Sequence, residues 1–148
     1  MKLELLSMIS MAAIFAVCCS KVPETTGLKD GRLAECPDKP NCVSSMTNNK
    51  SHFIEPFSYK GEFNKAKNAI AEAVKSQDRA EIISDNENYI HAEFKSKLFR
   101  FTDDVEFLID DKNKTVHIRS ASRVGYSDMG VNRKRMESLR IVFNEKMK

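Results

Sequence analysis

The chain has 148 residues, of which 41% are hydrophobic and 30% are charged, and its net charge is +3. This length suits one domain that buries its own core, and we find no low-complexity segment and no internal repeat. Residues 112–148 are basic, with ten Lys and Arg against three Asp and Glu. Such a segment suits an anionic surface or nucleic acid, or a charged helix face that keeps the protein soluble, and we favour the helix face.

The start of the chain predicts a signal peptide over residues 1–18. Lys2 supplies a short positive segment, and Leu5 to Val17 is apolar except for two serines. These 13 residues are fewer than the roughly 17–25 that span a bilayer as a helix. The alternative is a buried N-terminal helix of a cytosolic protein. The polar segment that follows argues against it and predicts a tether over residues 19–32.

The end of the apolar stretch predicts lipid attachment at Cys19. Ala16 to Ser20 resembles the lipobox of bacterial lipoproteins, in which the cysteine after the cleavage site receives diacylglycerol. Cys19 fits this pattern better than Cys18, although Ala16 stands where Leu is usual. Two or three acyl chains anchor a protein stably to a bilayer, whereas a single chain is marginal. Simple secretion after ordinary cleavage is the alternative.

Cys36 and Cys42 then remain as an even pair, and a disulfide between them is expected in an oxidising compartment. Pro37 and Pro40 bend and stiffen the chain between the two cysteines, which favours closure of the loop. A zinc site is the alternative, but the cysteine spacing and three scattered histidines do not match zinc patterns. We therefore expect no metal and no cofactor.

Hydrophobic periodicity predicts one helix and five strands in the middle of the chain. Residues 51–59 predict a short edge strand, because Pro56 cannot donate to a central ladder. An apolar stripe predicts an amphipathic helix over residues 62–76. Short polar turns separate four further strands, which makes neighbours antiparallel. These strands are predicted over residues 80–84, over residues 89–95, around Val105 to Ile109, and around Val116 to Ser120.

The chain ends in a predicted helix over residues 129–147, with Asp128 as its N-cap. Its buried stripe consists of Met136, Leu139, Val142, Phe143 and Met147. The resulting order, β-α-β-β-β-β-α, predicts one α+β domain over residues 33–148. We expect two layers, an antiparallel sheet of four to five strands covered by two helices.

Two stretches are unlike an ordinary scaffold, namely CPDKPNCVSS over residues 36–45 and RSASRVGYSDMGVNRKR over residues 119–135. Together with FRFTDDVEFLID over residues 99–110, they resemble the domain-of-unknown-function family 1499, found in bacterial and plastid proteins. The resemblance runs from about Leu33 to the C-terminus, with the three blocks in the family's order. It implies an exported or membrane-attached protein, and it carries over no activity, cofactor or catalytic residue.

The second of these stretches is a candidate anion site. A helix N-terminus presents free N–H groups and a partial positive charge, and Arg adds bidentate hydrogen bonds to a carboxylate or phosphate. The candidate anion-binding residues are Arg119, Arg123, Arg133, Ser122, Ser127 and Asn132. The alternative is internal pairing, in which carboxylates neutralise the arginines and make a rigid corner. The carboxylates available for this pairing are Asp103, Asp104 and Asp128.

The sequence therefore predicts an uncharacterised cell-envelope lipoprotein with a binding or structural domain. Its expected partners are the lipid bilayer, through the N-terminal acyl anchor, and a small anionic ligand or an envelope protein. Export removes nucleic acid from the expected partners. The expected location is the periplasm or outer membrane, with secretion as the alternative. A hydrolase or transferase that uses the Arg, Ser and Asp cluster is the second function, although no known nucleophile motif surrounds the serines.

Overall fold

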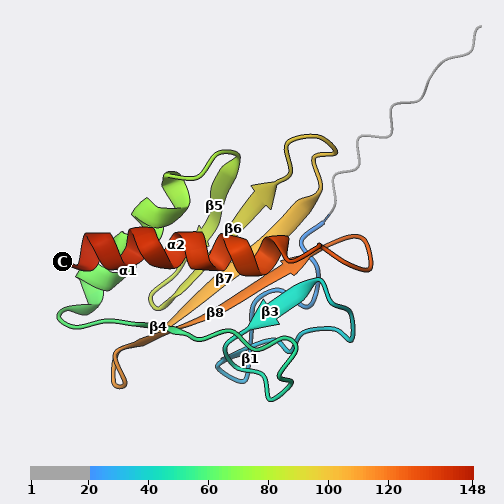
Figure 1. Cartoon of the computed structure of the whole chain (residues 1–148). Helices are drawn as coiled ribbons and strands as arrows, with labels where there is room; N and C mark the ends of the chain where they lie inside the picture. Colours follow the sequence, from blue (N-terminus) through green and yellow to red (C-terminus); the bar gives the residue numbers. More distant parts are fainter. Residues whose placement is uncertain (1–20) are drawn as a thin grey trace, which may run out of the picture.

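The computed structural model describes residues 21–148 (Figure 1). The predicted signal peptide over residues 1–18 and the predicted lipid site at Cys19 lie outside the described residues. Within residues 21–148, no helix is long and apolar enough to cross a membrane.

An antiparallel sheet of six strands forms one layer of the domain. The path of hydrogen-bonded neighbours is β3-β8-β7-β6-β5, and β4 pairs with β8 beside β3. Both short strands therefore line the outer edge of β8. The strand bounds are Cys42–Ser44 for β3, Phe57–Ser58 for β4, Ala80–Asp85 for β5, Tyr89–Lys95 for β6, Thr102–Asp110 for β7 and Thr115–Ser122 for β8.

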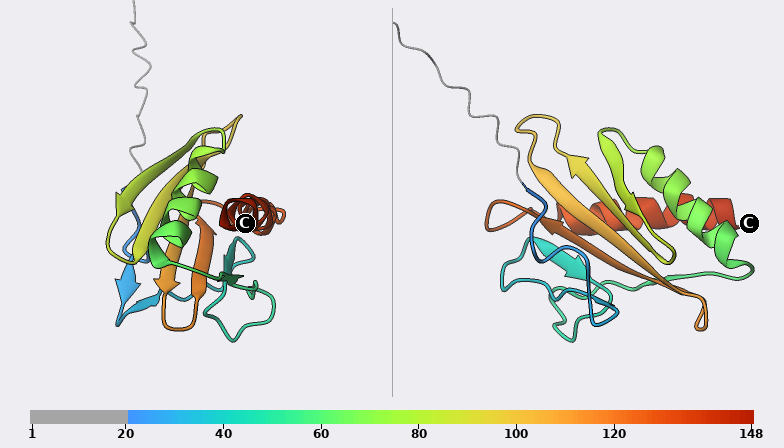
Figure 2. Two further views of the ribbon diagram at one scale, coloured as in Figure 1. Left: turned by 90° about the vertical axis from the view of Figure 1, so that its left-hand side faces the viewer. Right: turned by 180° about the vertical axis from the view of Figure 1, so that it is seen from behind.

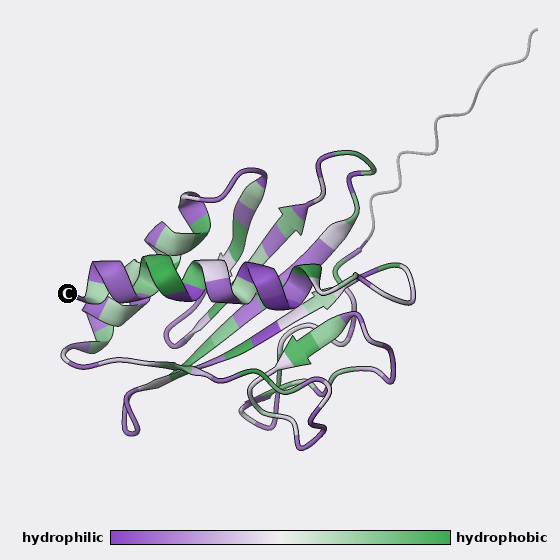
Figure 3. Ribbon diagram, in the orientation of Figure 1, coloured by the Kyte–Doolittle hydropathy of each residue, from purple (hydrophilic) through white to green (hydrophobic). Residues whose placement is uncertain are grey.

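Two helices cover one face of this sheet, α1 over Phe63–Lys75 and α2 over Val131–Met147 (Figures 1 and 2). The strands alternate apolar and polar side chains, visible as banding along β6 and β7 in Figure 3, so one face supplies a continuous apolar surface. The main core lies between this face and the helices. The α+β class and two-layer architecture predicted from the sequence are confirmed.

The predicted helices and the four long strands are present, with bounds that match the prediction or differ from it by up to three residues. The sequence analysis missed β3, which is only three residues long and follows a proline-rich loop. Its buried side chains are held in the sheet by pairing with β8, in the register Cys42 to Ala121 and Ser44 to Arg119. Local propensity cannot reveal such a strand, because a distant partner holds it in place.

The chain before β3 packs on the opposite face of the sheet, which differs in part from the tether predicted over residues 19–32. A two-stranded hairpin forms there, with β1 at Leu28–Lys29 and β2 at Arg32–Leu33. Leu33 joins Tyr89, Leu108 and the partly buried Met46 in a second, smaller apolar cluster. The chain before β3 is polar because most of its side chains are exposed, although its backbone is held against the sheet.

Asp128 caps the N-terminus of α2 from two residues before the helix boundary. Its Oδ2 accepts a hydrogen bond from the N–H of Asn132 at 2.7 Å, and its Oδ1 accepts one from Gly130 at 2.9 Å. Gly130 takes the left-handed conformation, with φ of 78°, a region that glycine occupies without strain. Two of the free N–H groups at the start of α2 are therefore already bonded to the Asp128 carboxylate.

The predicted disulfide between Cys36 and Cys42 is present, with a sulfur–sulfur distance of 2.00 Å. Its loop carries Asn41, whose backbone oxygen accepts hydrogen bonds from the Ser122 N–H and the Asn132 Nδ2. The side-chain Nδ2 of Asn41 donates to the Gly125 oxygen at 2.9 Å. The disulfide loop therefore ties the end of β8 to the start of α2.

Reducing this disulfide is expected to lower the free energy of unfolding by about 2 kcal/mol, because the cross-link removes loop entropy from the unfolded chain. Denaturant unfolding with and without reductant measures the difference. The double variant Cys36→Ser, Cys42→Ser is the control, because reductant cannot change its stability. Peptide mass after thiol alkylation of the unreduced protein provides a direct check, and alkylated Cys36 and Cys42 would contradict the bond.

Candidate functional site

The second face of the sheet carries charged side chains that are almost completely buried. They alternate with the apolar core residues along β6, β7 and β8, so the strand period of two places them together. The cross-strand register sets Glu106 opposite both His91 and Arg119, and Asp104 opposite Glu93. We call this set the polar face; it consists of Tyr89, His91, Glu93, Asp104, Glu106, Arg119 and Arg123.

Glu106 is one of the two acceptors that organise the polar face, and its side chain is fully buried. Its Oε2 accepts from Arg119 Nη1 at 2.7 Å, and its Oε1 accepts from the Tyr89 hydroxyl at 2.8 Å. Oε1 also accepts from the backbone N–H of Gly27 at 2.7 Å. Gly27 has φ of 105°, which glycine tolerates. Glu106 thus fastens the N-terminal segment to the sheet.

Burial and the nearby Glu106 carboxylate also act on the Tyr89 hydroxyl. Both raise the pKa of Tyr89 far above its ordinary value, burial being the larger cause. Tyr89 therefore stays protonated and acts as a hydrogen-bond donor to Glu106 at any physiological pH.

Asp104 is the second organising acceptor. Both of its oxygens accept hydrogen bonds from the Arg123 guanidinium, at 2.7 and 2.8 Å, and Oδ1 lies 2.8 Å from His91 Nε2. Burial opposes ionisation of Asp104, but the hydrogen bonds from Arg123 and His91 outweigh it, so its pKa is lowered from its ordinary value. Asp104 is therefore a carboxylate at neutral pH.

Arg123 bridges two acids, because its Nη2 also pairs with Glu93. The hydrogen bonds with Asp104 are the main cause that raises the pKa of Arg123 above its ordinary value, against the opposing effect of burial. Arg123 is therefore held as a permanent cation within the polar face.

A pocket opens between the polar face, the Cys36–Cys42 loop and the N-terminal segment. Its volume is about 180 Å³, room for about six waters at roughly 30 Å³ each. We call it the Thr26 pocket; among the residues that line it are Thr26, Lys39, Asn41, Asp104, Arg119 and Arg123.

Three residues around this pocket each carry one buried polar side-chain atom without a hydrogen-bond partner. Over residues 21–148, the buried side-chain atoms without a partner are Thr26 Oγ1, Asn41 Oδ1 and Arg119 Nε. All three residues line the Thr26 pocket. A buried polar atom without a partner costs about 1–3 kcal/mol, so three in one pocket call for a polar occupant.

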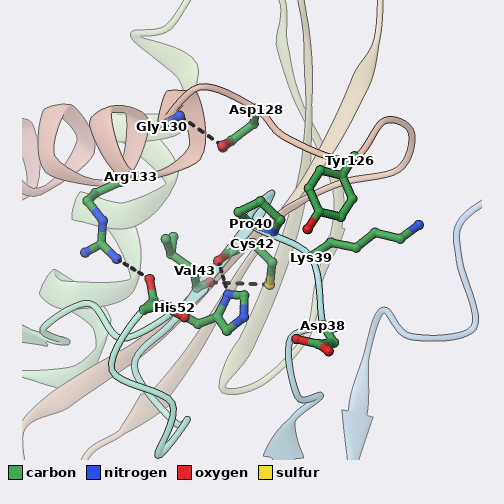
Figure 4. Close-up of a pocket in the computed structure, with 11 residues that line it drawn as sticks. Asp38, Lys39, Pro40, Cys42, Val43, His52, Tyr126, Asp128, Gly130 and Arg133 are labelled. Carbon is green, nitrogen blue, oxygen red and sulfur yellow. Dashed lines mark hydrogen bonds between the residues drawn. The ribbon is translucent and has the colours of Figure 1, made fainter.

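The structure divides the candidate anion-binding residues between two pockets. Arg119, Arg123 and Ser122 line the Thr26 pocket. Arg133 lines a different pocket of about 270 Å³, shown in Figure 4, which also contains His52 and Tyr126. In that pocket the Arg133 guanidinium donates to the Ser51 oxygen at 3.2 Å.

The other two candidate anion-binding residues serve the framework. Asn132 is fully buried, its Nδ2 donates to the Asn41 oxygen and to Ser122 Oγ, and its Oδ1 accepts from Ser120 Oγ. Ser127 is exposed, and its Oγ accepts from the Met129 N–H at 3.3 Å. Neither residue lines the Thr26 pocket.

The three candidate carboxylates have different partners. Asp104 pairs with Arg123, while Asp103 points to the helix side of the sheet and pairs with Arg135 at 2.5 Å. Asp128 accepts a hydrogen bond from the Asn132 N–H and so caps α2. The acid that pairs with Arg119 is Glu106.

Sequence reasoning missed Glu106 and Asn41 as site residues. The sequence does contain a signal for Glu106, because Glu106, like Asp104, alternates with the apolar residues of its strand. Which basic residue it faces depends on the register between β7 and β8, which the sequence leaves open. Asn41 lies in the stretch 36–45 that the sequence singles out, but its place in the pocket depends on how the disulfide loop lies on β8.

Comparison with known proteins assigns the family. A family model described as "Protein of unknown function (DUF1499)" matches residues 32–143. The chain belongs to the DUF1499 family. Comparison with curated proteins gives no match. The matched region of this DUF1499 protein contains the disulfide, the polar face and all but the N-terminal residues of the Thr26 pocket.

The serine and histidine pair nearest to a catalytic arrangement lies away from the Thr26 pocket. Ser45 Oγ is 3.5 Å from His117 Nδ1, longer than the roughly 2.6–3.2 Å of a nucleophile and its base. Ser45 Oγ also accepts from the Ile118 N–H at 2.9 Å. Over the described residues, no carboxylate makes a hydrogen bond to His117, and no cluster of side chains suits a metal ion.

Replacing Asp104 by Asn is expected to lower the free energy of unfolding of this DUF1499 protein by about 3–5 kcal/mol, because it leaves the buried Arg123 guanidinium short of a partner. Folding lowers the pKa of Asp104, so its ionised carboxylate stabilises the folded protein. This stabilisation is fully present above the pKa of an unfolded Asp, about 3.9, and is lost as the pH falls through the lower pKa of the folded state. Denaturant unfolding between pH 2 and pH 7, taken as roughly the range in which carboxyls titrate, measures both effects.

Asp85→Asn is the matched control, because Asp85 forms a partly exposed pair with Lys67. Such a pair is worth about 0–1 kcal/mol. Equal losses in the two variants would show that the Asp104 pair adds nothing through burial and would contradict this account of the polar face.

Proposed function

We propose that this DUF1499 protein is a lipid-anchored cell-envelope domain that binds a small oxyanion in the Thr26 pocket. The observation that supports binding is that three residues lining one pocket each have a partnerless polar atom, two of these residues being less than 4% exposed. Protein interiors rarely leave such atoms unsatisfied. The pocket is therefore built for an occupant with matching hydrogen-bond groups.

The partnerless atoms define the chemistry of the ligand. Arg119 Nε carries an N–H that can only donate, so it needs an acceptor such as a carboxylate or phosphate oxygen. Asn41 Oδ1 can only accept, because the Nδ2 of the same amide already donates to Gly125. The Thr26 hydroxyl can do either. The best ligand thus combines an acidic oxygen with a neighbouring hydroxyl or amine.

Lys39 adds a positive charge at the exposed side of the pocket. No ion pair of Lys39 occurs within residues 21–148, whereas Arg119 and Arg123 are matched by Glu106, Asp104 and Glu93. A ligand that carries one negative charge would therefore neutralise Lys39 and leave the buried pairs intact.

Binding is a better account of this site than catalysis. A general acid or base works best with a pKa near the operating pH. Asp104, the acid that lines the Thr26 pocket, has a lowered pKa and is bound to Arg123 and His91. The serine in the pocket, Ser122, already accepts from Asn132 and has no base beside it among the described residues.

Replacing Thr26 by Val is expected to have opposite effects on stability and on binding. The unligated variant should be as stable as the wild type or slightly more stable, because a partnerless hydroxyl is removed. Its ligand affinity should fall by about threefold to tenfold, the worth of one hydrogen bond. The measurement is the shift in melting temperature with millimolar phosphate, acetate or glycolate, because ligand binding stabilises the folded state.

Glycolate should protect the wild type more than acetate does, because its hydroxyl can donate to Asn41 Oδ1. Thr102→Val is the control, since Thr102 is also half-buried but lies outside the pocket. If none of these anions raises the melting temperature of the wild type, ordered waters fill the pocket and the binding proposal fails.

The anchor proposal has a separate test at Cys19. Expression of the full chain in a bacterium should give a membrane-bound protein whose N-terminal peptide has the added mass of acyl chains on Cys19. Cys19→Ser should release the protein from the membrane or block its processing, while Cys18→Ser should not. An unmodified mature N-terminus would contradict the anchor and leave the ligand test unaffected.

A further inference from the structure

Exposed apolar side chains gather in two loops, although such residues usually lie scattered over a protein surface. The β6–β7 loop exposes Leu98, Phe99 and Phe101, at 79%, 69% and 51% of their surface. The β8–α2 loop exposes Val124, Tyr126 and Met129, at 51%, 70% and 89%. At these six positions more than half of each residue's surface stays exposed in the fold of residues 21–148.

Both loops lie at the end of the molecule where the described chain begins. Figure 1 shows the β6–β7 loop above, and the β8–α2 loop beside, the point where the chain enters the domain. The view from behind in Figure 2 shows the same three segments together at one end. The β7–β8 turn lies at the opposite end of the sheet in both figures.

The β6–β7 loop has the composition of a segment that enters a lipid headgroup layer. Residues 95–101 carry three cations, Lys95, Lys97 and Arg100, and no acid. The rings of Phe99 and Phe101 stack on each other with centroids 5.5 Å apart, and so present one apolar surface. Aromatic rings favour the membrane interface, and Lys and Arg are attracted to anionic lipids.

The length of the linking chain favours the bilayer over other occupants. Thr26 already packs in its pocket and Gly27 is bonded to Glu106, so at most seven residues separate Cys19 from the folded domain. Seven residues reach about 25 Å when fully extended. An anchor at the N-terminus therefore holds this end of the domain close to the lipid surface.

We propose that the β6–β7 and β8–α2 loops form a docking surface that rests on the lipid bilayer, with Phe99 and Phe101 inserted among the headgroups. This inference rests on the proposed membrane attachment of the N-terminal segment, but it does not require acylation or the Thr26 pocket. It fixes the orientation of the domain, with the β7–β8 turn pointing away from the membrane.

The chain contains no tryptophan, which allows a single-site test. The variants are Phe99→Trp on the proposed surface and Lys112→Trp in the exposed β7–β8 turn as the matched control. Each full chain is reconstituted through its own N-terminal segment into vesicles of phosphatidylcholine and phosphatidylglycerol, with and without lipids brominated on their acyl chains. Flotation of the vesicles reports attachment, and tryptophan emission reports docking.

The expected result is a blue-shifted emission at position 99 that brominated lipid quenches at least twofold, with no shift and no quenching at position 112. Unquenched, solvent-like emission at position 99 in chains that float would overturn docking while leaving attachment intact. A blue shift without quenching would place a second copy of the chain on the loop and would also overturn the proposal. Equal quenching at both positions would show that the domain is attached without a fixed orientation, and this result would also overturn the proposal.

A second variant separates insertion from misfolding. Phe99→Asp combined with Phe101→Asp should abolish the lipid dependence of a tryptophan placed at Leu98, without changing the melting temperature, because all three side chains are exposed. Quenching that survives both changes would overturn the role of the two rings.

Discussion

Ion pairing on the second face of the sheet is the constraint on which the rest of this structure depends. Glu106 and Arg119 are 0% and 2% exposed, and a charge removed from water in this way is stable only when it is paired and hydrogen-bonded. The three central strands place the partners in register, so that carboxylates on β7 lie between a histidine and a tyrosine on β6 and two arginines, one on β8 and one directly after it. The sheet can thus be covered on both faces, by helices on one and by irregular chain on the other.

This arrangement explains why the N-terminal segment is ordered despite its polar composition. It buries little apolar surface beyond Leu33, but its Gly27 N–H completes the hydrogen bonds of Glu106. The disulfide loop then lies against the end of β8, where Asn41 holds the loop to Ser122 and Asn132 through its backbone oxygen. The Thr26 pocket is the space that remains between these two irregular segments and the paired charges.

The pocket and the exposed loops share one end of the domain, which links the two proposals without making either depend on the other. Residues 23–26 contribute to the pocket wall and are also the first part of the chain after the proposed anchor. A domain docked through its β6–β7 and β8–α2 loops would hold the Thr26 pocket near the lipid surface.

The sequence by itself determined the elements that depend on local periodicity. The helix over Phe63–Lys75 and the strand Tyr89–Lys95 follow from the spacing of their apolar residues, and so does the assignment of Asp104 and Glu106 to one face. The pairing of Cys36 with Cys42 followed from their being the even pair after the predicted processing. The three sequence blocks were enough to identify the DUF1499 family.

Tertiary structure alone decided which charges meet and where the pocket lies. Arg119 could have paired with Asp103, Asp104 or Asp128 on sequence grounds, but the register of β7 with β8 places it opposite Glu106. Asp103, one residue away from Asp104, faces the helices and binds Arg135 instead. Arg133 and Arg119 are close in sequence, yet the disulfide loop separates the pockets that they line. Strand register and loop placement depend on contacts between residues distant along the chain, which no local pattern encodes.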